Sequence, residues 1–67
     1  ALEVQCPQPL LDKLPKNKRA ALLGVLKNDP RPAYQHDPDR VYAMDFGGYR
    51  VQFQVSESML TVIDIQK

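Results

Sequence analysis

The sequence predicts an α+β fold in which a strand and two helices precede a three-stranded antiparallel meander, with the helices on one face of the sheet. Apolar residues recur at helical spacing between Leu10 and Leu26, and the hydrophobic period changes to two from Arg40 onward. Of the 67 residues, 43% are apolar and 25% are charged, which is the composition of a small globular domain and not of a disordered tail. We therefore expect residues 1–67 to form a single domain with a thin core.

The N-terminal half is predicted to contain one strand and two helices. It begins with LEVQC, an alternating stretch that Pro7 closes, as is typical of an edge strand. A short helix follows in PQPLLDKL, and Pro15 opens a second helix. The second helix ends near Asn28, because Pro30 disfavours a helical conformation of Asp29. Its predicted apolar stripe consists of Ala21, Leu22, Val25 and Leu26, with Leu23 at the edge.

The C-terminal half is predicted to contain three strands. The alternating stretches are RVYAMDF, YRVQFQV and MLTVIDIQ, and they are separated by GG and SES. Gly47 and Gly48 supply the positive φ that a tight hairpin needs, so the strands form an antiparallel meander. One side of the middle strand faces the helices and carries Tyr49, Val51, Phe53 and Val55. The other side is polar and free to bind a partner, and it carries Arg50, Gln52 and Gln54.

A proline-rich connection joins the helical half to the meander. It contains Pro30, Pro32 and Pro38, which keep the backbone extended or turned. Prolines restrict the unfolded chain, so a stiff crossover loses less entropy on folding than a flexible linker would.

Charge is distributed unevenly along the chain. Residues 13–31 contain six basic residues against one acid, Asp29, whereas residues 32–67 contain three basic residues against five acids. A basic helical half and an acidic strand half would steer an anionic partner toward one side. The alternative is an ordinary solvated helix surface.

Residues for catalysis or metal binding are scarce. The single cysteine, Cys6, is expected to be a small buried hydrophobe, and His36 a loop residue without the spacing of a metal site. The stretch FGGY lies between strands, so it is not a phosphate-binding loop before a helix. We expect no catalytic, metal or cofactor site in this chain. Such a chain, starting at Ala1, is expected to be one domain of a longer protein, and its free thiol and lack of a signal peptide or membrane span fit the cytoplasm.

The stretch DPRPAY and the residues close behind it combine arginines with tyrosines. Arginine offers planar donors to phosphate and tyrosine offers a stacking face to bases, so the mixture suits RNA contacts. The candidate RNA-binding residues are Arg31, Tyr34, Arg40 and Arg50. Tyrosines near a sheet are more often structural, and this alternative stays open.

The segment from LKNDPRPAYQHDPDRVYAM to VSESMLTVIDI resembles the C-terminal domain of the TsaA/TrmO family, and DPRPAY followed by RVYAM is its most specific part. The resemblance implies an accessory domain of an S-adenosylmethionine-dependent methyltransferase that modifies N6 of a threonylcarbamoylated adenosine beside the tRNA anticodon. The donor site and catalytic centre would lie in an N-terminal β-barrel. The partner of this domain would be the anticodon region of tRNA or that barrel. Ala43 and Asp45 stand where the family often has a Gly and a basic residue, so an outward Asp45 would weigh against RNA binding by the sheet face.

The order of elements is also similar to the RelE/ParE toxin fold, through LPKNKR and GGYRVQFQV. That resemblance implies an RNA-cleaving or gyrase-directed toxin, although only Arg40 and Arg50 provide basic groups on the strands. A third alternative is a protein interaction module whose strand edge pairs with a partner or with a second copy in a homodimer.

Overall fold

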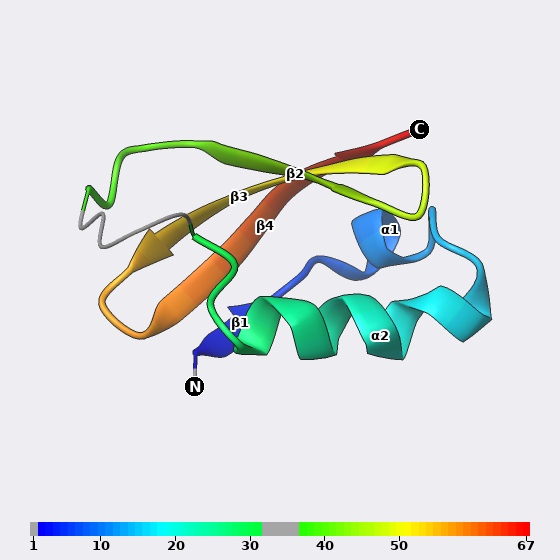
Figure 1. Cartoon of the computed structure of the whole chain (residues 1–67), viewed down its shortest axis with the longest axis horizontal. Coiled ribbons are helices and arrows are strands. Elements are labelled where there is room, and N and C mark those ends of the chain that lie inside the picture. The colour runs from blue at the N-terminus through cyan, green and yellow to red at the C-terminus, as the bar shows by residue number, and fades with distance from the viewer. Residues whose placement is uncertain (1, 32–36) are drawn as a thin grey trace.

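The computed structural model describes residues 2–31 and 37–67, and in this part the chain forms two helices and four strands (Figure 1). The predicted α+β fold is confirmed, and so is the order of its elements. The elements are β1 (Glu3–Gln5), α1 (Gln8–Leu11), α2 (Lys16–Lys27), β2 (Tyr42–Phe46), β3 (Tyr49–Ser56) and β4 (Met59–Gln66).

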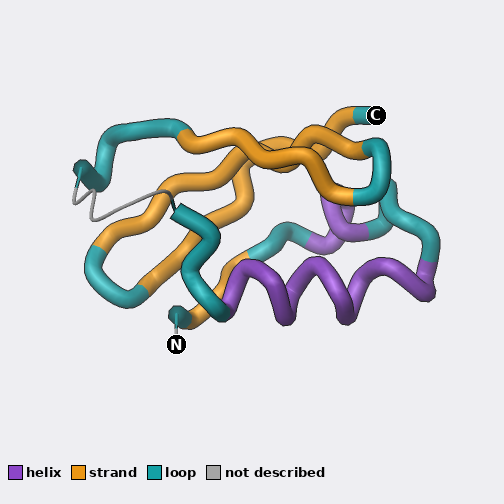
Figure 2. The backbone as a smooth tube through the Cα atoms, in the orientation of Figure 1, coloured by secondary structure: helices purple, strands orange, loops and turns teal. Residues whose placement is uncertain are grey.

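The strands form one mixed sheet in the order β1-β4-β3-β2. β2, β3 and β4 make the predicted antiparallel meander, and β1 pairs in parallel with the first half of β4, from Glu3 opposite Met59 to Gln5 opposite Thr61. β1 and β2 are thus the two edge strands, as predicted for β1. Both helices lie against one face of this sheet (Figures 1 and 2).

The core lies between the helices and the sheet. The buried side chains of β3 are Val51, Phe53 and Val55, as predicted, whereas Tyr49 is half-buried. The other buried hydrophobic residues are Leu14, Leu22, Leu26, Tyr42, Leu60, Val62 and Ile65. Cys6 packs against this cluster, and burial raises the pKa of its thiol. Each fully buried Leu, Val or Phe side chain stabilises the folded state by about 1.5–3 kcal/mol relative to an exposed one.

The predicted stripe of α2 is wrong at two of its positions. Leu22 and Leu26 are buried, but Ala21 is exposed and Val25 is 39% exposed. The buried face of α2 is rotated toward Lys18 and Arg19, which are both half-buried. Long basic side chains can cover apolar surface with their methylene stems, and a hydrophobicity pattern does not register this.

Residues with positive φ lie in the turns that follow α2, β2 and β3. Gly47 and Gly48 have φ of 57° and 86° and form the predicted hairpin between β2 and β3. Glu57 has φ of 57° in the turn between β3 and β4. α2 ends as predicted: Asn28 is its C-cap and Asp29 follows with φ of 57°, a conformation that Asp tolerates better than most residues.

The second face of the sheet is not covered by helices (Figure 2). On β3 it carries Arg50, Gln52 and Gln54, as predicted, and Asp45 of β2 pairs in register with Arg50. Among the residues that the structure describes, no helix is long and apolar enough to span a membrane.

Candidate functional site

Arg31 directly follows the turn that ends α2 and is held by Asp29. Its Nε lies 2.8 Å from Asp29 Oδ1 and its Nη2 lies 2.6 Å from Asp29 Oδ2, so the guanidinium and the carboxylate form a two-point contact. The Arg31 side chain is only 13% exposed. The hydrogen bonds from Arg31 lower the pKa of Asp29, and the carboxylate in turn raises the pKa of Arg31. Arg31 therefore holds the start of the proline-rich connection against the end of α2, and it presents little charge to a partner.

Arg40 and Arg31 come together at Tyr42, the first residue of β2. The guanidinium carbon of Arg40 lies 5.4 Å from the centre of the Tyr42 ring, within reach of a cation–π interaction. The Tyr42 ring also stacks on Phe53, with 5.4 Å between the ring centres. The Tyr42 hydroxyl is buried without a well-formed hydrogen bond to the described residues, and its proximity to the Arg31 guanidinium contributes to the raised pKa of Arg31. Tyr42 is therefore a core residue that lies beside two arginines, with Arg40 over its ring and Arg31 near its hydroxyl.

Arg50 lies apart from these two arginines. It pairs in register with Asp45, three residues further along β2 than Tyr42, which corresponds to about 10 Å of strand. Its side chain is on the uncovered face of the sheet, whereas Tyr42 faces the core. A shallow depression of about 280 Å³ next to it is lined by Ala43, Met44, Asp45 and Arg50. The outward Asp45 places an acid beside Arg50, which weighs against RNA binding by this face of the sheet.

The four candidate residues therefore do not form one site. Arg31 and Arg40 meet at Tyr42, Arg50 is separate, and Tyr34 falls outside the described residues, as does His36.

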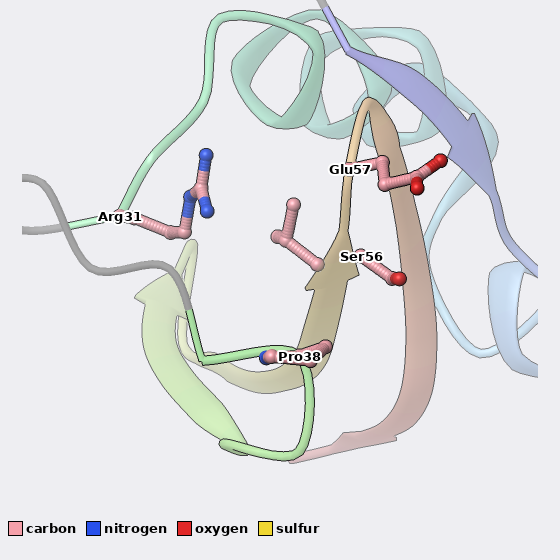
Figure 3. A pocket seen from close by; sticks show the side chains of 5 residues that line it. Arg31, Pro38, Ser56 and Glu57 are labelled. Atoms are coloured by element: carbon pink, nitrogen blue, oxygen red, sulfur yellow. The ribbon is translucent and has the colours of Figure 1, made fainter.

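A pocket of about 370 Å³ opens between the crossover and the turn that joins β3 to β4 (Figure 3). It is lined by Arg31, Pro38, Val55, Ser56 and Glu57. Arg31 and Glu57 stand on opposite sides, and the Glu57 carboxylate points away from the Arg31 guanidinium (Figure 3). The described lining combines a paired guanidinium, a hydroxyl, apolar groups and a carboxylate that points away from the guanidinium, which suits contact with a chain segment better than acid–base chemistry. Within residues 2–31 and 37–67, no three His, Cys, Asp or Glu side chains gather as a metal site.

A cluster of basic residues at the hairpin end of the molecule was not predicted. The tip of the β2–β3 hairpin, the start of α2 and the end of β4 lie together at this end, on the right in Figure 1. We call this region the basic end, and it comprises Lys13, Lys16, Lys18, Arg50 and Lys67. Lys18 Nζ lies 3.3 Å from the carbonyl oxygen of Gly47, and Lys13 Nζ lies 3.0 Å from that of Ile65. The charge count along the chain indicated a basic helix, but only the fold shows that part of it meets the hairpin.

Comparison with known proteins identifies the family. A family model described as the TrmO C-terminal domain matches residues 1–67. A protein of Eikenella corrodens, named tRNA (adenine(37)-N6)-methyltransferase, is 37% identical over 49 residues, which are 73% of this chain and 28% of that protein. The chain thus corresponds to a minor part of this relative, and no solved structure matches it. The match over the whole length shows that the chain belongs to the TrmO C-terminal domain family.

Proposed function

We propose that this chain is an accessory domain of a tRNA (adenine-N6)-methyltransferase and assists tRNA binding or the positioning of the catalytic barrel. The observation that carries the proposal is the family match over residues 1–67, together with the activity named for the relative. The 28% coverage of the relative leaves most of such an enzyme outside the matched segment. S-adenosylmethionine is the methyl donor expected for the parent protein, and its site would lie in that larger part.

The shape and chemistry of the chain support an accessory role. Its described pockets are open depressions, and Arg31, which lines the pocket of Figure 3, is engaged by Asp29, while Arg40 lies over the Tyr42 ring. Such groups hold a surface in a fixed shape, which is what a positioning domain requires. A tRNA-modifying role would place the protein in the cytoplasm.

Methyl transfer by the protein that carries this chain tests the proposal. We expect the whole protein to transfer a tritiated methyl group from S-adenosylmethionine to tRNA, and the chain alone to transfer none. Removing the chain should raise the KM for tRNA, or lower kcat if the chain positions the barrel. Methyl transfer by the 67-residue chain alone, or unchanged kinetics after its removal, would contradict an accessory role.

A further inference from the structure

Basic side chains from separate segments converge at the basic end. Lys16 and Lys18 lie in the first turn of α2, and the ammonium of Lys18 reaches the tip of the hairpin at Gly47. The ammonium of Lys67 lies 5.8 Å from the centre of the Tyr49 ring, directly after the hairpin. Arg50 pairs in register with Gln66 and so lies beside the end of β4. These contacts place the lysines around the hairpin end of the molecule, and Arg50 lies at the same end on the uncovered face of the sheet.

The acids at this end do not neutralise it. Asp12 is 3.6 Å from Arg19, and Asp64 is 3.8 Å from Lys13, so each is matched by one basic residue. Asp45 pairs in register with Arg50. Lys16, Lys18 and Lys67 form no ion pair with the described residues and remain as excess positive charge.

The first turn of α2 carries these charges against the preference of the helix. The N-terminus of a helix favours acids, because its free amide groups carry partial positive charge. α2 has no acid in its first turn and no side-chain cap, and places Lys16 and Lys18 there instead. Where a chain departs from such a local rule, a functional reason is expected.

The opposite end of the molecule has the reverse character. It carries Asp29, Asp37, Asp39 and Glu57 against Lys27 and two arginines, and the arginines, Arg31 and Arg40, are engaged by Asp29 and by the Tyr42 ring. The molecule is 31 Å long, and the two ends lie at opposite ends of this axis (Figure 1). Exposed charges are screened over about 8 Å at physiological ionic strength, so each end acts on a partner independently.

We propose that the basic end is the surface through which this chain contacts the phosphate backbone of tRNA. The inference rests on the proposed function for the choice of RNA as the polyanion. Its lysines are point charges suited to phosphate, and Tyr49 is half-buried with its ring near Lys67, so it offers little stacking surface to a base. The contact therefore positions the RNA and does not read its sequence.

A charge-reversal pair on α2 tests the inference. Lys16 and Lys27 are both exposed lysines, at the first and last positions of the same helix, and Lys16→Glu and Lys27→Glu change the net charge equally. The affinity of each variant for a fluorescent anticodon stem-loop RNA is measured by anisotropy at about 0.15 M salt. One lost phosphate contact weakens binding about four- to fivefold at this salt concentration, so K16E, which changes two charge units, should weaken it about twentyfold. K27E should have little effect.

Two further measurements complete the test. The slope of log K against log salt should become shallower by about 0.7–0.9 in K16Q, since one phosphate is no longer neutralised. NMR shifts on RNA addition should gather at Lys16, Lys18, Gly47 and Lys67. A higher Tm of K16E than of the wild-type chain would show that its weaker binding does not come from unfolding.

Several results would overturn the inference. They are equal losses in K16E and K27E, shifts confined to Arg31 and Arg40, and no RNA binding by the wild-type chain. If the chain binds no RNA but its removal still lowers tRNA methylation, the basic-end inference fails and the accessory role stands. If the parent protein does not methylate tRNA although the chain binds RNA at the basic end, the proposed function fails.

Discussion

At the scale of single residues, Asp29 and Arg31 show how a sequence motif with the chemistry of a binding site can serve the fold. Arg31 has the guanidinium that phosphate recognition requires, but Asp29, two residues earlier, engages it at two points. Asp29 can do so because it adopts a left-handed conformation at the end of α2. The pair fixes the direction in which the chain leaves the helix.

The Asp29–Arg31 pair should make stability depend on pH in the acid range. Arg31 lowers the pKa of Asp29, so the stabilisation is present above the unfolded pKa of Asp, about 3.9, and is lost as the pH falls through the lower folded value. We expect Asp29→Asn to be less stable than the wild-type chain at pH 7, and the difference to shrink as the pH falls below about 4. Urea unfolding over a pH series measures this difference. Asn also tolerates positive φ, so a difference independent of pH would show that the ion pair contributes nothing.

At the scale of elements, α2 carries the main departure from the sequence-based expectation. Its buried face was predicted from the hydrophobic pattern, but Val25 and Ala21 are exposed while Arg19 is half-buried. Arg19 donates from Nε to the carbonyl oxygen of Leu14 at 3.0 Å, so a charged residue completes the join between the two helices. A prediction from hydrophobicity places Arg in the solvent, so it assigns the wrong face of the helix to the core.

Gly24 of α2 offers a simple gain in stability. A Cβ at this position would meet no atom within 4 Å, and the residue lies within a helix, where Ala is favoured over Gly. Gly24→Ala should raise the free energy of unfolding by about 0.5–1 kcal/mol, measured by urea denaturation. Gly48→Ala is the matched control and should be destabilising, because Gly48 has φ of 86°. A loss of stability in G24A would contradict the open space that the structure shows around Gly24.

Lys16 at the start of α2 should lower the stability of the chain while it adds positive charge to the basic end. Replacing it with Glu places an acid where the helix dipole favours one, so Lys16→Glu should raise the free energy of unfolding by about 0.3–1 kcal/mol. Lys27→Glu at the last turn should lower it by a similar amount, since a basic residue is favoured there. Both values come from urea denaturation at low salt, and about 1 M salt should reduce both effects. Identical stabilities would contradict the view that the first turn is locally unfavourable.

At the scale of the whole molecule, the sequence predicts the order of elements well because each has a local signal. Pro7 and Pro15 mark the boundaries of the first strand and the second helix, and the two glycines mark the hairpin. The parallel pairing of β1 with β4 joins residues more than fifty positions apart, and no local pattern encodes it. The candidate site was predicted less well, because it also depends on contacts between residues that are far apart in the sequence.

Each candidate residue was chosen for its own chemistry, and the structure shows what surrounds it. Arg31 could have been recognised as paired, because Asp29 precedes it by two residues. The basic end could not have been recognised from the sequence, because the contact between Lys18 and Gly47 spans twenty-nine residues and exists only in the folded chain. The possibility of a homodimer through a strand edge stays a prediction, and light scattering on the purified chain would measure it.

The 31 Å length of the molecule separates its two ends in space as well as in charge. If the basic end contacts RNA, the end of α2 and the turn between β3 and β4 lie at the other end of this axis (Figure 1). The chain would then act as a rigid spacer between an RNA at the basic end and a partner bound at the opposite end. The four-stranded sheet and the Asp29–Arg31 pair would then matter for rigidity, because bending of the chain would change the distance between the two bound surfaces.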